Sequence, residues 1–318
     1  MRFIVKTIVF TFLMTIAVVL FPLLPVSQTS SFEELVIDEP PVEKAKPLSQ
    51  QLAELNGRGA GSRWEQDSAA ILVDYFQQLG LEPLPQYPDF LQKFKIGTVT
   101  HFMEDGRLRF RTIGTAINPS QNVLGYLPGR DPDGKWIILG AHYDGQGEVD
   151  NTIYPSANDN LSGVLALTAL AKAMANEHHL NYTILFVAFG AEEVGLLGSD
   201  HLANNLPIAK EKIQAVINLD TIGKTSDTLH LYATEINPII SLLTPIFYDY
   251  GFKAETVIAN GISDHYPFAL KGIPSVTVAT NNWKEGNHSP EDRLESLNLE
   301  QIGSIAGALK QSLCYMLR

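Results

Sequence analysis

Residues 136–145, WIILGAHYDG, join a short apolar run to a histidine and an aspartate. An apolar run of this length is typical of a strand buried on both faces of a sheet. In an open α/β sheet, the functional site lies beyond the carboxyl ends of the strands. Because His142 and Asp144 follow the run directly, this stretch predicts the fold class and the sheet edge where polar side chains gather.

Strands and helices are predicted to alternate on either side of this stretch. Further apolar runs predict strands over residues 182–189, 213–219, 229–233 and 275–279. Apolar residues at helical spacing predict helices over residues 65–79, 161–175, 196–204, 238–250 and 299–317. Residues 108–127 are expected to form two strands around a turn at Asn118-Pro119. This order predicts a single three-layer α/β/α domain with a mostly parallel central sheet.

The composition limits the classes of function. The chain has 318 residues, of which 45% are hydrophobic and 18% are charged, as expected for a globular protein. Its formal net charge of −12 argues against a nucleic-acid partner, because such binding relies on Lys and Arg that neutralise phosphates. Cys314 is the only cysteine, which excludes an intrachain disulfide and a cysteine-cluster metal site. A transition metal would therefore be held by His, Asp and Glu.

The first residues have the pattern of an export signal. Arg2 and Lys6 precede residues 7–26, which carry no charge. A cleaved signal peptide and an uncleaved membrane anchor both fit, because the run is long but contains Pro22 and Pro25. We expect a signal or anchor over residues 1–30, a linker over 31–47 and one folded domain over 48–318. The folded domain is expected to be exported across the cytoplasmic membrane, as a periplasmic, secreted or anchored protein.

Side chains that bind metals follow the predicted core strands. Zinc binds imidazole nitrogen and carboxylate oxygen, and two zinc ions about 3.5–4 Å apart need a bridging carboxylate and separate terminal ligands. A hydrolytic site also needs a carboxylate that takes a proton from water. Adjacent Glu192 and Glu193 suit this division of roles. The candidate residues at this edge are His142, Asp144, Asp159, Glu192, Glu193, Asp220 and His288.

Each candidate also has a structural explanation when it is taken alone. An acidic pair after a strand is commonly a solvated turn or a helix cap, and Asp159 could cap the helix that follows it. The placement of all the candidates at the ends of strands that share one sheet edge favours the metal site over these separate explanations.

Six motifs, in the same order along the chain, resemble metallopeptidase family twenty-eight. This is a family of co-catalytic zinc aminopeptidases with an α/β aminopeptidase fold, and the resemblance runs from about Gly57 to the C-terminus. The motifs are GAHYDG (140–145), PSANDNLSG (155–163), FGAEEVGLLGS (189–199), NLDTIG (218–223), SDHYPF (263–268) and NHSPEDRLESL (287–297).

The resemblance implies two zinc ions per chain. Asp159 matches the carboxylate that bridges both ions. His142 and Asp220 match the other ligands of one ion, and Glu193 and His288 match those of the second. Cobalt and manganese remain open as the native metal.

The resemblance also implies the reaction and its remaining participants. Glu192 matches the general base that deprotonates a metal-bridging water, and Asp144 matches the acid that orients the ligand histidine. The implied substrates are peptides with a free N-terminus, from which the N-terminal residue is hydrolysed. Asn287 stands where many members have a tyrosine that stabilises the oxyanion. Tyr154 and Tyr266 are both open as replacements.

Two other functions are compatible with the same fold. A glutaminyl cyclase would use one zinc ion in an aminoacyltransferase reaction, and a non-catalytic peptidase homologue would use none. Because the chain keeps the residues for both ions and the base, the peptidase is favoured. The metal content would separate the three.

Overall fold

A mixed sheet of eight strands forms the middle layer of the fold in the computed structural model. The central strands β6, β3, β7 and β10 are parallel, as are β8 and β9, whereas β1–β2, β2–β6 and β10–β8 are antiparallel. The spatial order is β1 (Leu91–Glu104), β2 (Arg107–Leu127), β6 (Thr183–Phe189), β3 (Trp136–His142), β7 (Ile213–Leu219), β10 (Ser275–Thr280), β8 (Thr228–Ala233) and β9 (Lys253–Ile258). A separate hairpin consists of β4 (Gly147–Val149) and β5 (Thr152–Tyr154).

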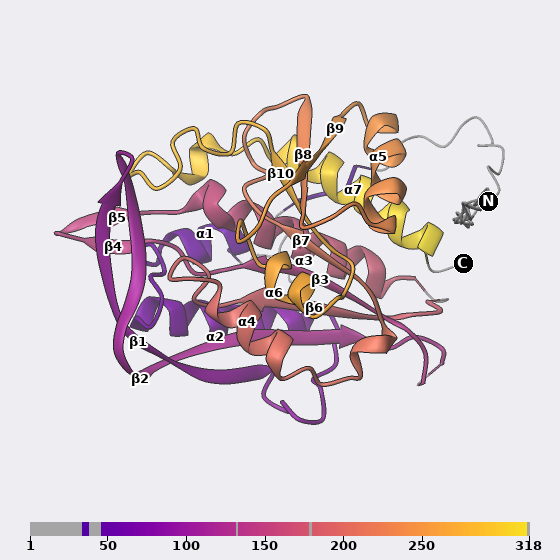
Figure 1. Ribbon diagram of the computed structural model, residues 1–318, viewed down its shortest axis with the longest axis horizontal. Helices are drawn as coiled ribbons and strands as arrows, with labels where there is room; N and C mark the ends of the chain where they lie inside the picture. Colours follow the sequence, from indigo (N-terminus) through magenta and orange to yellow (C-terminus); the bar gives the residue numbers. More distant parts are fainter. Residues whose placement is uncertain (1–33, 38–45, 132, 178–179, 317–318) are drawn as a thin grey trace, which may run out of the picture. The chain divides into compact units, whose positions relative to one another are not determined.

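Helices cover both faces of the sheet (Figure 1). Alternating residues of β3 enter two different apolar clusters: Ile137 and Leu139 face one side, and Trp136 and Ile138 face the other. This alternation explains why the strand is apolar throughout, and it confirms the expected three-layer α/β/α architecture. The first cluster includes α1 (Leu48–Ala53), α2 (Arg63–Gln78), α3 (Ser162–Ala175), α5 (Pro238–Asp249) and α7 (Leu299–Met316), and the second includes α4 (Leu197–Asn204) and α6 (His265–Leu270).

Two glycines permit close packing beneath the sheet edge that carries the candidate residues. A Cβ atom on Gly140 would lie 2.3 Å from the ring of Phe189 on the adjacent strand. A Cβ atom on Gly163 would lie 2.4 Å from the backbone oxygen of Leu219. Neither approach is possible for a larger residue, so these glycines allow β3 and α3 to lie against the neighbouring strands.

One predicted element is wrong. Residues 108–127 form a single strand, β2, rather than two strands around a turn at Asn118-Pro119. Pro119 pairs with Lys95 of β1, next to a shift in register between Ile96 and Thr98. A proline has no N–H to give to a sheet, and such an irregularity accommodates it. The chain reverses earlier, between the end of β1 and the start of β2, so the two strands form a long hairpin.

The structure describes residues 34–37, 46–131, 133–177 and 180–316. The predicted signal or anchor lies outside these residues, and the proposed domain boundaries remain predictions. Within the predicted linker, Leu35 is buried, and its N–H donates to the backbone oxygen of Gly303 at 3.2 Å. Of the helices in the described part of the chain, none has both the length and the apolar character needed to cross a membrane.

Candidate metal centre

The structure brings the predicted ligand residues together at the carboxyl ends of the central strands. One set of atoms that could bind a metal comes from His142, Asp159 and Asp220, and a second comes from Asp159, Glu193 and His288. Within each set, the candidate ligand atoms lie within 4.8 Å of one another. Residues far apart in the sequence thus meet because parallel strands end at one sheet edge.

Asp159 faces both sets with different oxygen atoms. Its Oδ1 lies 3.1 Å from Nε2 of His142, and its Oδ2 lies 3.3 Å from Nε2 of His288. His142 Nε2 is also 3.6 Å from Oδ1 of Asp220, and His288 Nε2 is 3.3 Å from Oε2 of Glu193. A carboxylate that offers one oxygen to each of two ligand sets has the arrangement required of a metal bridge.

Several atoms of the cluster are suited to a cation. His142 Nε2 and Asp220 Oδ1 are buried and have no hydrogen-bond partner in the described part of the chain. Buried polar atoms normally have partners, since leaving them unpaired is unfavourable. Imidazole nitrogen and carboxylate oxygen are both zinc ligands. The donor set and its unpartnered atoms therefore fit divalent zinc.

The charges of the cluster stabilise positive charge at this spot. Burial alone would lower the pKa of His288, but the neighbouring carboxylates of Glu193 and Asp159 raise it to about 11. The pKa of His142 is likewise raised well above its ordinary value, against the effect of burial, by Glu192, Asp159 and Asp220. Burial, together with the charge of Asp159, raises the pKa of Glu193. Cations placed between these mutually repelling acids would stabilise them.

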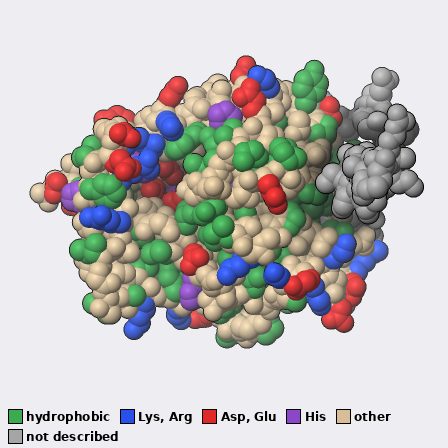
Figure 2. Space-filling view, viewed as in Figure 1, with side chains coloured by type: hydrophobic (Ala, Val, Ile, Leu, Met, Phe, Trp, Pro, Cys, Tyr) green, Lys and Arg blue, Asp and Glu red, His purple; other side chains and the backbone are tan. Residues whose placement is uncertain are grey.

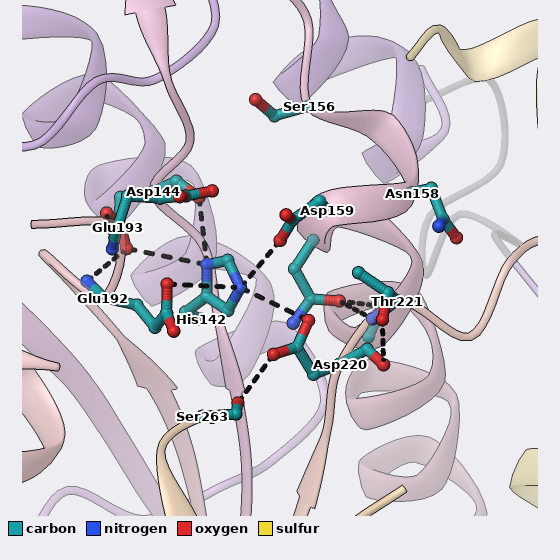
Figure 3. A network of polar contacts seen from close by, with 12 residues as sticks. His142, Asp144, Ser156, Asn158, Asp159, Glu192, Glu193, Asp220, Thr221 and Ser263 are labelled. Carbon is teal, nitrogen blue, oxygen red and sulfur yellow. Dashed lines mark hydrogen bonds and ion pairs between the residues drawn. The ribbon is translucent and has the colours of Figure 1, made fainter. Parts of the chain in front are cut away.

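Glu192 lies at the edge of the two ligand sets. Its Oε2 is 3.9 Å from Nε2 of His142, and both side chains point toward the same space (Figure 3). Burial raises the pKa of Glu192 well above its ordinary value, with His142 acting in the opposite direction. His142, Glu192 and Glu193 form a third possible grouping of ligand atoms. However, the two sets that share Asp159 already use both histidines, which leaves the Glu192 carboxylate available for another role.

Asp144 holds the turn that carries the two glutamates. Its Oδ1 accepts the N–H of Glu192 at 3.0 Å, and its Oδ2 accepts the N–H of Glu193 at 3.2 Å (Figure 3). The carboxylate lies 3.7 Å from Nδ1 of His142, whereas the backbone oxygen of Asp144 lies nearer, at 3.2 Å. Asp144 therefore contacts the histidine mainly through its backbone. Burial raises the pKa of its carboxyl to about 7.

The backbone is strained at several of these positions. Ala191, Thr221 and His288 have φ angles of 56°, 53° and 57°, in the left-handed region that side chains disfavour. Ala191 precedes Glu192, and Thr221 follows Asp220. Strain of this kind is typical of functional sites, where the surrounding structure imposes an unusual backbone to place a side chain.

Five supporting hydrogen bonds were not predicted from the sequence. Asp292 accepts the N–H groups of Asn158 and Asp159, at 2.8 and 3.1 Å, and so fixes the loop of the shared aspartate. Ser263 donates its hydroxyl to Oδ2 of Asp220 at 2.6 Å. The other two contacts are a hydrogen bond from Gln146 to Glu193 and one, 2.6 Å long, between His288 Nδ1 and the backbone oxygen of Leu108.

A buried arginine joins two of the segments that carry the cluster. Arg58 is 1% exposed, and its guanidinium donates to three backbone oxygens, those of Tyr143, Pro155 and Ser156. Burial lowers the pKa of Arg58 to about 10, so it remains charged at neutral pH. Arg58 thus ties the segment after β3 to the loop before Asp159.

Five residues of the cluster line a cavity of about 310 Å³: Asp159, Glu192, Glu193, Asp220 and His288. Figure 2 shows acidic side chains inside a hollow that basic side chains border. Among the tyrosines of the described residues, Tyr232 lines this cavity, whereas Tyr154 and Tyr266 do not. Neither of the two tyrosines considered from the sequence therefore faces the site. The cavity walls come mainly from the β1–β2 hairpin and from segments after β9 and β10, and they include Phe102, Arg107, Arg109, Ile262 and Trp283.

Comparisons with known proteins agree with this geometry. The sequence model of peptidase family M28 matches residues 122–312. Aminopeptidase YwaD of Bacillus subtilis (strain 168) is 30% identical over 197 residues, which cover 58% of this chain and 42% of that protein. The chain thus spans less than half the length of this curated relative.

Solved structures share the fold. A zinc aminopeptidase from Bacillus subtilis has a TM-score of 0.69 at 18% identity, over 85% of this chain and 94% of that one. A glutaminyl cyclase from Porphyromonas gingivalis has a TM-score of 0.64 at 18% identity, over 85% and 96%. The family match covers more than half of the chain and includes the segments that carry His142, Asp159, Glu193, Asp220 and His288. The chain therefore belongs to peptidase family M28.

Proposed function

We propose that this protein is an aminopeptidase that binds two zinc ions and removes N-terminal residues from peptides. Asp159 would be shared by the two ions, His142 and Asp220 would complete one site, and Glu193 and His288 would complete the other. The observation that carries the proposal is the position of Asp159, whose two oxygens lie 3.1 and 3.3 Å from the two histidines. The names of the relatives support the reaction class.

Glu192 acts as the general base in this proposal. Bound zinc supplies Lewis-acid chemistry that activates water and polarises a peptide carbonyl. Glu192 takes a proton from the attacking water and delivers it to the departing amine as the C–N bond breaks. Asp144 keeps Glu192 in place because its carboxylate accepts a hydrogen bond from the backbone N–H of Glu192. The buried carboxylates favour a cationic group nearby, which suits the free N-terminal amine of a peptide.

Hydrolysis of aminoacyl-p-nitroanilides tests this function. We expect activity in the zinc-loaded protein, loss of activity with a chelator and recovery when zinc is added. Glu192→Gln should keep its zinc but lose about 10²- to 10⁴-fold in kcat, the usual contribution of a general base. Glu211→Gln, which changes an exposed glutamate, is the matched control. Unchanged turnover in Glu192→Gln would contradict the proposed role.

The cyclase alternative makes a different prediction. A fold neighbour is a glutaminyl cyclase, and such an enzyme would cyclise N-terminal glutamine with a single zinc ion. Both ligand sets are present in this chain, and a two-ion site favours hydrolysis. Release of a cyclised product from glutaminyl peptides, with one zinc ion per chain, would support the alternative instead.

The cellular location is a separate proposal. The basic residues and uncharged run at the start of the sequence favour export, with cleavage and anchoring both open. Fractionation of cells that express the full chain, followed by N-terminal sequencing of the product, tests this. An intact chain in the cytoplasm would contradict export.

A further inference from the structure

The β1–β2 hairpin reaches into the candidate site. The backbone oxygen of Leu108 accepts a hydrogen bond from Nδ1 of His288 at 2.6 Å, which requires the start of β2 to lie against the cluster. Side chains alternate along a strand. Because the side chain of Leu108 is buried, its neighbours Arg107 and Arg109 face the other side of the strand, and both line the cavity.

The residues that pair with these arginines on β1 lie on the same face of the hairpin. Glu104 pairs with Arg107 across the hairpin, and Phe102 pairs with Arg109. All four side chains line the cavity that holds the cluster. The end of the hairpin therefore forms one wall of the candidate active site, with two positive charges and one negative charge.

Arg107 lacks a partner for its buried donors. Its Nε and Nη2 atoms are buried and form no hydrogen bond with any described residue. The Nε of Arg109 also has no hydrogen-bond partner among the described residues, but it lies 3.6 Å from Glu104 Oε2, which supplies a charge partner. The guanidinium carbon of Arg107 lies 5.2 Å from the centre of the Trp283 ring, which supports it from one side. A held guanidinium with unpaired donors in a cavity is suited to bind a planar anion through two parallel hydrogen bonds.

The acids of the cluster do not supply that anion. Asp159 and Glu193 attract Arg107 electrostatically, but both already have close partners. Asp159 lies 3.1 and 3.3 Å from the two histidines, and Glu193 lies 3.3 Å from His288 and accepts a hydrogen bond from Gln146. In the proposed enzyme, these carboxylates would also be neutralised by the cations that they bind. The positive charge of Arg107 is then left for a group that enters the cavity.

We propose that Arg107 binds a carboxylate of the peptide substrate and so determines which peptides the enzyme prefers. This inference rests on the proposed function, because it concerns the same cavity. The carboxylate has two possible sources, which are the C-terminus of a short peptide and the side chain of an acidic residue. A cavity of about 310 Å³ has room for a small ligand, so a short peptide would place such a group within reach of the wall.

Paired substrates measure the preference directly. One pair is Leu-Gly and its C-terminal amide, and the other is glutamyl- and glutaminyl-p-nitroanilide. In the zinc-loaded protein, we expect a higher kcat/KM for the anionic member of one pair, and that pair identifies the source. Arg107→Met, which keeps an unbranched apolar side chain but removes the charge, should reduce the preference about 10- to 100-fold, the usual effect of losing hydrogen bonds to a charged group.

A matched variant and a binding measurement complete the test. Arg63→Met removes an exposed arginine at the start of α2 that does not line the cavity, and it should leave the preference unchanged. Calorimetric titration of both pairs into Glu192→Gln protein measures the same preference in Kd without turnover. If the wild-type protein hydrolyses none of these substrates, the proposed function is contradicted. The inference still holds in that case if Glu192→Gln binds the anionic substrate more tightly and the Kd preference falls in Glu192→Gln/Arg107→Met. The inference would be overturned by equal kcat/KM preferences in wild type and Arg107→Met, together with equal Kd preferences in Glu192→Gln and Glu192→Gln/Arg107→Met.

Discussion

Asp292 offers a sharp test of how the chain positions the shared aspartate. Its two oxygens accept the backbone N–H groups of Asn158 and Asp159, at 2.8 and 3.1 Å, and the side chain is fully buried. In Asp292→Asn, one of these oxygens becomes an amide nitrogen, which cannot accept a hydrogen bond. One of the two backbone N–H groups is then left buried and unpaired, so the loop of Asp159 loses part of its support.

The size of the effect follows from the lost contact. A hydrogen bond to a charged group contributes about 1.5–3 kcal/mol, which corresponds to about a 10- to 150-fold change in an equilibrium constant. Because the contact holds a proposed ligand, we expect the loss to fall mainly on zinc affinity. Replacing a residue that orients a metal ligand typically lowers affinity about 10- to 100-fold, in the same range.

Competition with a chromophoric zinc chelator measures the affinity. Asp249→Asn changes an exposed aspartate at the end of α5 and should match the wild type. Circular dichroism and urea unfolding of the metal-free proteins separate a local effect from misfolding. If folded Asp292→Asn binds zinc as tightly as the wild type, the hydrogen bonds from Asp292 do not position the metal site.

Three further predictions concern the site and its support. Ser263→Ala removes the 2.6 Å hydrogen bond to Asp220 and should weaken zinc binding about tenfold in the same competition assay, whereas unchanged affinity would refute this role. Burial lowers the pKa of His265 to about 4, so the imidazole binds a proton less readily in the folded protein than in the unfolded chain. As the pH is lowered from about 6.5 to about 4, the free energy of unfolding should therefore fall by up to about 3 kcal/mol more in the wild type than in His265→Gln. Urea midpoints with the same pH dependence in both proteins would contradict this. Leu165→Ala, at a fully buried position of α3, should lower the free energy of unfolding by about 2–5 kcal/mol without changing the zinc content, and a loss of zinc would show that the core and the site are coupled more tightly than we expect.

The sequence predicts the central part of the fold because those elements are encoded locally. β7 occupies residues 213–219, as expected, since an apolar run between polar segments identifies a buried strand. The same reasoning places His142 and Asp220 at one edge, where the structure brings them within 3.6 Å. Strand ends in a parallel sheet converge, so a correct order of strands is enough to gather such residues.

The hairpin and the supporting contacts depend on information that is not local. β1 was not predicted because it has no apolar run: polar and apolar side chains are mixed along it, and only 3 of its 14 residues are buried. Asn118-Pro119 resembled a turn, although Asn118 donates to the backbone oxygen of Gly97. Ser263 and Asp292 lie inside recognised motifs, so their presence there was a usable signal. The contact of His288 with the backbone of Leu108 had no such signal, because a backbone oxygen carries no information in the residue type.

The number of zinc ions bound per chain tests the central claim most directly. Metal analysis of purified wild-type protein after zinc loading and removal of excess metal should give two ions per chain. Asp159→Ala should lose zinc from both positions, because the same side chain serves each of them. One ion per chain in the wild type, or full occupancy in Asp159→Ala, would contradict a centre built around a shared carboxylate.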